Sequence, residues 1–451
     1  MVTVLDLIGE TPLVEVIRLD RGPCRLFLKL ESANPSGSIK DRPARTMIEA
    51  AEADGRLKPG GTIVEATAGN TGLGLALVGA QKGYRTVLVV PDKMSREKVL
   101  HCRALGAQVI LTRSDVGKGH PDYYQDLAVT ITQRTPGAFH INQFANPANP
   151  EAHEKTTGPE ILRQMDGDVD AIVVGVGSGG TLTGIGRFMQ RASPKTEMIL
   201  ADPVGSVLAP LVNTGTMTQA GSWTVEGIGE DFVPPNADLK LVREASSVSD
   251  QDSFAAARDL LRKEGVLAGS SSGTLLTAAL RYCRKQTNPK RVVSLVCDSG
   301  AKYLSKVFND AFLVQEGWIE RHGTVRDLVV SRHGDGAVEV KPNDPLRTVF
   351  ARMRAADVSQ LPVVDGERIV GLVDESDLLG DILTEGAATA FQRPVKDVMV
   401  TRLETISADA PIRDLVPLFR KDYVAIVMDG TRFLGLVTRI DLINHFRIAL
   451  Q

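Results

Sequence analysis

The chain has 451 residues, a length that predicts about three domains. Hydrophobic residues make up 43% and aromatic residues 5% of the sequence, an ordinary composition for a globular protein with a sizeable core. The net charge of −3 provides no basic surface for a nucleic acid, and no apolar run approaches the ~18 residues of a membrane-spanning helix.

The amino-terminal residues and the cysteines favour a cytoplasmic protein. Asp6 and Glu10 interrupt the first apolar residues, so no secretory signal is expected. No cysteine pair has the C-x-x-C spacing of a redox or metal site. We therefore expect no metal and four reduced thiols, which are Cys24, Cys102, Cys283 and Cys297.

Residues 1–320 alternate between strand and helix patterns. Short apolar runs predict strands at 62–65, 86–90, 108–111, 171–174, 198–201 and 292–296. Helical patterns lie between them, for example at 73–79 and 95–105. This alternation predicts an α/β fold with parallel sheets that helices cover on both faces. In such sheets ligands bind where the strands end.

Four segments of this region carry groups that suit one cofactor; they are residues 38–41, 67–72, 175–181 and 269–273. The Lys40 amine can bond to an aldehyde, and the glycine-rich loop that Thr181 ends can offer backbone N–H groups to a phosphate. Asn70 can hydrogen-bond a ring hydroxyl, and Ser271 can face a ring nitrogen. Together these groups predict a site for pyridoxal 5′-phosphate.

Each segment also has another interpretation. A lone lysine is usually a solvated surface residue, and residues 175–180 fit the dinucleotide fingerprint G-x-G-x-x-G. Asp202, which ends the next predicted strand, stands near the place of a ribose-binding acid. A dinucleotide site leaves the other three segments without a role, however, whereas pyridoxal phosphate uses all four.

Residues 317–323 predict a linker, and after it the chain repeats itself. Residues 361–379 align with residues 424–443, and each copy is typical of a hairpin around an acid-glycine turn, followed by a helix. The pair resembles a tandem CBS-domain (Bateman) module, which often binds adenosyl ligands. The resemblance implies two CBS domains, at 324–386 and 387–451.

Only one copy carries the nucleotide pattern of such modules, G-h-h-[T/S]-x-x-D, in which h is apolar. The second copy fits it with Gly435, Thr438 and Asp441, whereas Asp374 occupies the Thr position of the first copy. A carboxylate there would repel a phosphate. The resemblance implies at most one adenosyl-ligand site, at Thr438 and Asp441. The alternative is that these residues cap a helix and that the pair only holds an oligomer together.

The amino-terminal two thirds resemble a known enzyme family. The sequence Leu-Ile-Gly-Glu-Thr-Pro-Leu at 7–13, the run Lys-Leu-Glu-x-x-Asn-Pro-x-Gly-Ser-x-Lys-Asp-Arg at 29–42 and Phe-Asn-Asp at 308–310 follow its order. They are similar to fold-type II pyridoxal-phosphate enzymes of the cysteine synthase and cystathionine β-synthase family. The resemblance implies a catalytic domain of two subdomains at 1–318, a linker at 319–323, and a homodimer or homotetramer.

The resemblance also implies roles for the cofactor residues. Lys40 would hold the cofactor and then act as general base and acid. Ser271 would face the ring nitrogen as a neutral hydroxyl, which favours loss and replacement of a β-substituent over transamination. The implied cofactor contacts are Lys40, Asn70, Gly177, Ser178, Gly179, Gly180, Thr181 and Ser271.

A second set of residues would bind substrates. Ala68 stands where the family usually has serine, so the loop that grips the substrate carboxylate lacks one hydroxyl donor. An acid at Glu230 or Asp231 could receive the amino group of homocysteine. The implied substrate contacts are Thr67, Ala68, Gly69, Thr71, Gln143, Gly227, Glu230 and Asp231.

The features that separate the family's branches are mixed. Residues 143–160 resemble cysteine synthases, whereas residues 225–232, residues 306–310 and the CBS pair resemble cystathionine β-synthases. Few residues precede Leu7, so no haem-binding segment is expected. We expect condensation of L-serine with L-homocysteine to L-cystathionine and water, with sulfide release from cysteine as a further reaction. The alternatives are an O-acetylserine sulfhydrylase and, in another class, a protein that senses an adenosyl ligand or serves as a scaffold.

Overall fold

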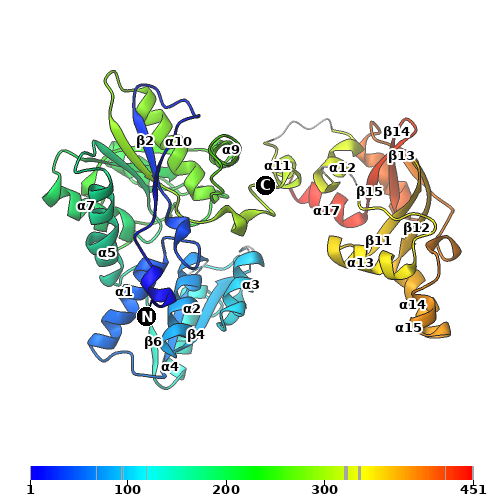
Figure 1. Cartoon of the computed structure of the whole chain (residues 1–451), viewed down its shortest axis with the longest axis horizontal. Coiled ribbons are helices and arrows are strands. Elements are labelled where there is room, and N and C mark those ends of the chain that lie inside the picture. Colours follow the sequence, from blue (N-terminus) through cyan, green and yellow to red (C-terminus); the bar gives the residue numbers. More distant parts are fainter. Residues whose placement is uncertain are drawn as a thin grey trace. The chain divides into compact units, whose positions relative to one another are not determined.

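Two separate sheets form the first unit of the computed structural model, residues 1–307, and residues 308–451 form the second unit (Figure 1). The structure describes residues 2–67, 69–92, 94, 96–117, 119–318, 323–333, 337–421 and 423–448. Both sheets follow the predicted alternation of strands and helices, so the α/β class is confirmed. No helix in the described part of the chain is both long and apolar enough to cross a membrane.

The smaller sheet has the order β5-β4-β3-β6, and its pairs are parallel. It contains the strands predicted at 62–65, 86–90 and 108–111. Strand β3 is buried along its whole length, as expected for a strand that is covered on both faces. The bounds are Thr62–Ala66 for β3, Arg85–Pro91 for β4, Gln108–Thr112 for β5 and Ala138–His140 for β6.

The larger sheet has the order β1-β2-β10-β7-β8-β9. Strand β1 runs antiparallel to β2, and the other pairs are parallel. The strands predicted at 171–174, 198–201 and 292–296 are β7, β8 and β10. The bounds are Leu13–Glu15, Arg25–Lys29, Ala171–Gly175, Glu197–Pro203, Val242–Val248 and Arg291–Leu295 for β1, β2, β7, β8, β9 and β10.

The chain passes from the larger sheet to the smaller one and back. In Figure 1 the blue amino-terminal segment connects the larger sheet (green) with the smaller sheet and its helices (cyan). Strands β1 and β2 come first, the smaller sheet follows, and β7 to β10 complete the larger sheet. As a result, the predicted motifs follow strands of both sheets.

Four helices begin at the predicted motifs, namely α1 (Asp41–Ala53), α2 (Asn70–Lys82), α7 (Gly180–Ala192) and α10 (Ser270–Arg284). Helix α2 starts three residues before the predicted helix at 73–79. A Cβ atom on Gly74 would lie 2.8 Å from the carbonyl oxygen of Lys40, so this glycine permits the close approach of α2 to the Lys40 segment.

The remaining helices of the first unit cover the sheets. The helix predicted at 95–105 is α3, although Ser95 lies outside the described residues. The bounds are Arg96–Ala104 for α3, Tyr124–Arg134 for α4, Ala148–Ala152 for α5, Gly158–Gln164 for α6, Leu208–Thr214 for α8 and Asp250–Asp259 for α9.

The second unit contains the predicted repeat. Each copy has an antiparallel hairpin with one bulge, β11–β12 or β14–β15, and then a helix, α14 or α17. Gly366 and Gly430 in the two turns have φ of 63° and 59°, which explains the glycine after the acid. The bounds are Gln360–Asp365 for β11, Arg368–Asp374 for β12, Glu375–Glu385 for α14, Ala425–Asp429 for β14, Arg432–Val437 for β15 and Arg439–Ile448 for α17.

The opening segment of each CBS copy packs in the core of the other copy. Helix α12 (Val325–His333) packs in the core of the second copy, where Val325 belongs to the same hydrophobic cluster as Leu415 and Val437. Val395 packs in the core of the first copy instead. The other elements of this unit are α11 (Asp310–Gln315), α13 (Leu346–Ala356), α15 (Ala387–Ala390), β13 (Thr405–Ser407) and α16 (Val416–Phe419).

Candidate active site

Lys40 stands directly before α1, as its N-cap residue. Within the described part of the chain, its amine has no hydrogen-bond or ion-pair partner. Burial lowers the pKa of Lys40, while Cys297, Glu230 and Asp298 act in the opposite direction. Lys40 is half-buried near acidic groups, and its amine is therefore easier to deprotonate than that of an ordinary lysine.

The residues next to Lys40 are held firmly. Asp41 accepts hydrogen bonds from the amide and the hydroxyl of Ser36, with 2.7 Å for the amide. Arg42 pairs with Glu31 at 2.7 Å and with Glu160 at 2.6 Å. Burial opposes the charge of Arg42, but the two carboxylates raise its pKa.

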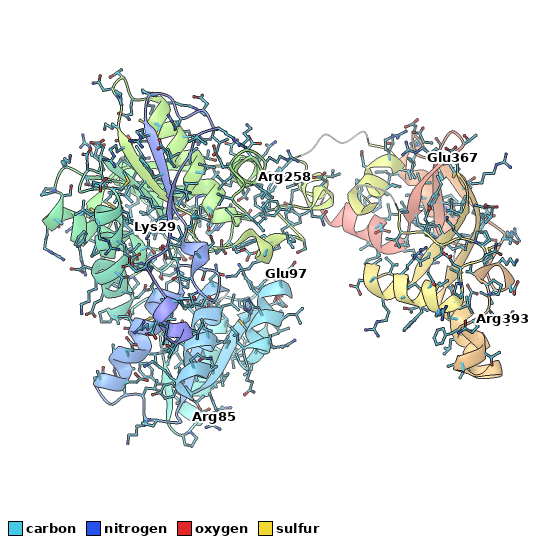
Figure 2. The ribbon with its side chains drawn as sticks, in the orientation of Figure 1. Lys29, Arg85, Glu97, Arg258, Glu367 and Arg393 are labelled. Atoms are coloured by element: carbon cyan, nitrogen blue, oxygen red, sulfur yellow. The ribbon has the colours of Figure 1, made fainter. Side chains whose placement is uncertain are left out.

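A buried lysine extends this ion-pair network. Lys29, which lies inside the first unit (Figure 2), donates to Glu160 at 2.8 Å. The burial of such a network makes the loss of one partner costly, because the remaining charges would stay buried without compensation. The segment that carries Lys40 is thereby fixed at the start of α1.

The glycine-rich loop follows β7 and begins α7. A Cβ atom on Gly177 would lie 2.6 Å from the carbonyl oxygen of Gly227, and one on Gly180 would lie 2.0 Å from Oδ1 of Asn149. Gly179 has φ of 86°, where glycine is favoured. The loop therefore packs closely and presents the first N–H groups of α7, which suit an anion.

The other two loop residues contact neighbouring side chains. Ser178 accepts a hydrogen bond from Asn149 at 2.9 Å, and the Thr181 hydroxyl lies 3.3 Å from Nε2 of His153. Asp202, the acid of the alternative dinucleotide interpretation, is fully buried and accepts from the amide of Ala209 at the start of α8 at 2.8 Å. Its carboxylate thus interacts with a helix start.

Ser271 is the second residue of α10 and is buried. Its neighbours fix the helix start, because Ser270 accepts from the amide of Glu226 at 3.2 Å and Ser272 accepts from the amide of Cys297 at 3.0 Å. Burial raises the pKa of the Cys297 thiol to about 12, and Ser271 acts against this through a hydrogen bond. Ser271 therefore belongs to the same enclosed region as Cys297 and Lys40.

Asn70 begins α2 and makes two hydrogen bonds. Its Nδ2 donates to Asp298 at 2.7 Å, and its Oδ1 accepts from Lys302 at 2.8 Å. Asp298 also accepts from the hydroxyl of Tyr303 at 2.6 Å. The sequence analysis did not single out these three partners, although they follow the predicted strand at 292–296, where the rule on strand ends could have indicated them.

Some of the residues predicted to bind the substrate carboxylate lie close together. Thr71 donates to Oε1 of Gln143 at 2.7 Å, and the amide of Gly69 donates to the hydroxyl of Thr67 at 3.3 Å. Both Thr67 and Gln143 are buried. Ala68 lies outside the described residues.

Glu65, at the end of β3, connects the two parts of this loop region. Its carboxylate accepts from the amides of Asn142 at 2.7 Å and Gln143 at 3.4 Å. Burial raises the pKa of Glu65 to about 8, although these hydrogen bonds act against the change. Glu65 thus positions the backbone that carries Gln143.

The two acids that follow Gly227, Glu230 and Asp231, differ in their exposure to solvent. Glu230 is half-buried, and burial together with Asp231 raises its pKa to about 8, while Lys40 acts in the opposite direction. Asp231 is exposed. Glu230, rather than Asp231, therefore lies within electrostatic reach of Lys40.

A third acid, Glu226, connects segments of the first unit that lie far apart in the chain. Lys98 of α3 donates to it at 2.6 Å and Lys306 donates to it at 2.7 Å. Burial opposes its ionisation, but the two lysines lower the pKa of Glu226. Lys98 also donates to the hydroxyl of Tyr303 at 2.9 Å. The sequence analysis missed this network because its members are far apart in the chain.

The candidate ligand residues of the second unit cap helices. The amide and hydroxyl of Thr438 donate to Asp441 at 2.7 and 2.6 Å. In the first copy the amide of Asp374 donates to Asp377 at 2.9 Å, and Asp374 accepts from the amide of Ser376 at 2.8 Å. The geometry of the capping alternative is thus present in both copies. No cluster of metal-ligating side chains occurs among the described residues.

Comparisons with known proteins identify the families of the two units. Residues 4–298 match the family model described as "Pyridoxal-phosphate dependent enzyme", and residues 325–384 and 395–448 match that of the CBS domain. The cystathionine β-synthase of Saccharomyces cerevisiae is 35% identical over 98% of this chain and 97% of that protein. Cysteine synthase A of Escherichia coli is 41% identical but covers 68% of this chain and 96% of its own length.

A solved structure supports the same fold. A hydrogen sulfide-producing enzyme from Fusobacterium nucleatum superposes with a TM-score of 0.63 at 36% identity. The match covers 67% of this chain and 99% of that chain.

Proposed function

Since the chain belongs to the cystathionine β-synthase family of pyridoxal-phosphate dependent enzymes, we propose that it replaces the hydroxyl of L-serine with the sulfur of L-homocysteine. The products are L-cystathionine and water. The protein is a pyridoxal-phosphate dependent lyase with a carboxyl-terminal CBS pair. Release of sulfide from cysteine is a further reaction of the same site.

One observation carries this proposal, namely the unpaired amine of the half-buried Lys40. It has no partner in the described part of the chain, and burial lowers its pKa. These properties fit a residue that bonds to the cofactor aldehyde and later moves a proton. Bound pyridoxal phosphate withdraws electrons from the substrate and so labilises its α-proton and β-substituent.

The neighbouring residues fit the rest of the cofactor. The start of α7 can bind the phosphate through the backbone of Gly177, Ser178, Gly179, Gly180 and Thr181. Ser271, at the start of α10, can meet the ring nitrogen with a neutral hydroxyl. Asn70 can donate to the ring oxygen. The loop of Thr67, Gly69 and Thr71, together with Gln143, can bind the substrate carboxylate through N–H and hydroxyl donors.

Glu230 favours homocysteine as the second substrate. It is half-buried near Lys40, so its carboxylate can pair with the ammonium group of an incoming amino acid. Sulfide has no such group. Gly227 supports this arrangement because its carbonyl lies close to the glycine-rich loop. Asp231, which is exposed, raises the pKa of Glu230.

The alternative reaction is that of a cysteine synthase, with O-acetylserine and sulfide. The identity of 41% to cysteine synthase A favours it, but that match covers 68% of the chain. The yeast cystathionine β-synthase matches 98% of the chain, which includes the CBS pair. The whole-length similarity and Glu230 together make cystathionine synthesis the better-supported reaction.

A direct assay separates these possibilities. The purified protein, reconstituted with pyridoxal phosphate, is supplied with serine and homocysteine or with O-acetylserine and sulfide. We expect cystathionine to form faster than cysteine. The absence of cystathionine with rapid cysteine formation would establish the alternative, and the absence of both products would leave a sensing or scaffold role.

Further proposals concern the molecule's organisation. We place the catalytic domain at 1–318, the linker at 319–323 and the CBS domains at 324–386 and 387–451. We also propose a cytoplasmic homodimer or homotetramer. Exposed apolar side chains on the second unit support an oligomer, since apolar surface of this kind is typical of contacts between subunits. They are Phe350, Leu379, Ile440, Ile443 and Phe446.

A further inference from the structure

The two hydrogen bonds of Asn70 have opposite polarity. Asp298 is a carboxylate and accepts from Nδ2 at 2.7 Å, whereas Lys302 donates to Oδ1 at 2.8 Å. An ionised carboxylate can only accept, and an ammonium group can only donate. The reversed amide would place its NH₂ group against the ammonium and its oxygen against the carboxylate. Only one orientation of the Asn70 amide satisfies both partners.

Both partners are themselves fixed. Asp298 is fully buried and accepts from Tyr303 at 2.6 Å, and Tyr303 accepts from Lys98 at 2.9 Å. Burial and Asp298 raise the pKa of Tyr303 well above its usual value, so its hydroxyl keeps its proton and remains a donor. Lys302 also donates to the carbonyl oxygen of Gly37 at 3.1 Å, three residues before Lys40. The amide therefore sits in a rigid frame.

The locked orientation determines what Asn70 can offer to a ligand. An amide nitrogen has two hydrogens, and Asp298 takes one of them. Within the described part of the chain, the second N–H has no acceptor. The oxygen is already engaged by Lys302. Asn70 can thus donate to a bound group through this N–H, whereas one of the two lone pairs of its oxygen already accepts from Lys302.

We propose that Asp298 and Lys302 are positioning residues that hold the Asn70 amide in this orientation, so that its remaining N–H donates to the cofactor's ring oxygen. The proposal rests on the proposed function, because it concerns the residue that faces that oxygen. A donor at this position favours the ionised ring oxygen over the hydroxyl form, because the ionised oxygen is the stronger acceptor. The frame thereby sets the electronic state of the bound cofactor without contacting it.

The absorption spectrum of the bound cofactor tests this proposal, because ionised and neutral ring oxygens absorb at different near-visible and near-ultraviolet wavelengths. Lys302→Met removes the donor to Oδ1 at similar length, and Asp298→Asn creates a partner that can either donate or accept. In both variants the neutral form should gain intensity, and the affinity of the apoenzyme for pyridoxal phosphate should fall by about 10-fold, since one charged hydrogen bond is lost.

Two control variants make the test specific. Lys302→Arg keeps a group that only donates, so it should restore most of the wild-type spectrum. Lys290→Met removes a half-buried lysine that pairs with Glu197 at 3.2 Å and has no role in the candidate site, and it should change neither the spectrum nor the affinity. If one positioning variant fails to fold, the other still decides the question.

The outcomes separate this inference from the proposed function. Wild-type spectra and affinities in both folded variants would overturn the positioning role, even if the wild type makes cystathionine. Shifted spectra that Lys302→Arg restores would support the role, even if the enzyme made only cysteine. A wild-type protein that binds no pyridoxal phosphate would overturn the proposed function and the inference together.

Discussion

The chemistry of Lys40 follows from the absence of a hydrogen-bond or ion-pair partner for its amine among the described residues. Lys40 is half-buried, and its amine has no partner within the described part of the chain, whereas the amines of Lys29, Lys98 and Lys302 are all paired. Burial lowers a lysine pKa because the charged form is the one that loses hydration. A partly buried amine without an ion pair is therefore suited to covalent chemistry, whereas a paired lysine stabilises the structure.

Replacement of Lys40 by alanine should abolish turnover. The variant should also lose the near-visible absorption of the attached cofactor, because no other described lysine is both half-buried and without a partner for its amine. The absorption spectrum and the cystathionine assay check both expectations. Lys195→Ala, which removes an exposed lysine that pairs with Asp168 at 2.8 Å, should leave both unchanged. Wild-type absorption in Lys40→Ala would refute the assignment.

Glu230 should give the second substrate a pH dependence. Its pKa is raised from 4.5 to about 8, so the fraction of carboxylate that can pair with an ammonium grows as the pH rises toward 8. The KM for homocysteine should therefore fall over that range in the wild type. In Glu230→Gln this part of the pH dependence should vanish, and the KM should increase by a factor that corresponds to about 1–3 kcal/mol.

Asp231→Asn is the matched control for Glu230. Asp231 raises the pKa of Glu230, so its removal should move the wild-type pH profile to lower pH without abolishing it. The rate of the half-reaction with serine alone should remain nearly constant in both variants. Equal damage to both half-reactions would instead show that the acids are structural.

At the level of elements, the end of β3 combines structure with function. Glu65 is buried there and accepts from two backbone amides of the segment that carries Gln143. Its native pKa of about 8 lies above the ordinary value of 4.5. Between these pH values the unfolded chain releases the proton while the native state keeps it, so the stability of the native state falls as the pH rises.

Glu65→Gln should reduce the loss of native-state stability that accompanies a rise in pH. The wild-type free energy of unfolding should decrease from pH 4.5 to 8 more steeply than that of the variant, by up to about 1.4 kcal/mol per pH unit. Urea unfolding of the cofactor-free protein at several pH values measures the difference. Glu49→Gln, a more exposed change, should retain the wild-type slope. Parallel slopes for wild type and Glu65→Gln would disprove the linkage.

The sequence predicts the strands that form apolar runs. Strands β3, β4, β7, β8 and β10 lie inside the sheets and follow from such runs, because both faces of a parallel sheet are covered. The edge strand β5 is also predicted by its apolar run, whereas the interior strand β2, which begins with Arg25 and ends with Lys29, is not. Strands β1 and β6 have three residues each, and β9 mixes exposed and partly buried positions, so neither length nor periodicity marks them. The start of α2 at Asn70 depends on the packing of Gly74 against Lys40, which no local pattern contains.

The candidate site likewise contains residues that the sequence predicts and residues that it does not. The motifs around Lys40, Asn70, the glycine-rich loop and Ser271 can be recognised because each is a short local sequence with its own chemistry. The frame of Asp298, Lys302 and Tyr303 cannot, since it meets Asn70 only through tertiary packing across more than half of the chain. Local sequence therefore indicates which groups contact a ligand, and the fold determines how those groups are oriented.

At the scale of the whole molecule, the CBS pair is a single packed unit. Because α12 packs with the second copy and Val395 packs with the first, each core depends on both halves of the repeat. A ligand in one copy can shift an equilibrium of the module only if it binds one arrangement more tightly than another. Any regulation of the enzyme would have to begin from such a difference.

The ligand prediction can be tested by calorimetry with S-adenosylmethionine, AMP and ATP. We expect at most one site per chain, in the second copy, and loss of binding in Asp441→Ala. Asp377→Ala removes the equivalent helix cap of the first copy and should leave binding intact. Two equivalent sites, or binding that survives Asp441→Ala, would contradict the single-site prediction. No binding of any of the three would favour a purely structural role.

The position of β2 in the larger sheet has a consequence for biosynthesis. Arg25 in β2 pairs with Arg291 in β10, so the strand that leaves the ribosome second must wait for one of the last strands of the first unit. The smaller sheet is complete by His140 and can form while translation continues. Nascent chains arrested before β10 should therefore expose β2 to protease but protect the smaller sheet, and equal protection of both regions would contradict this order of folding.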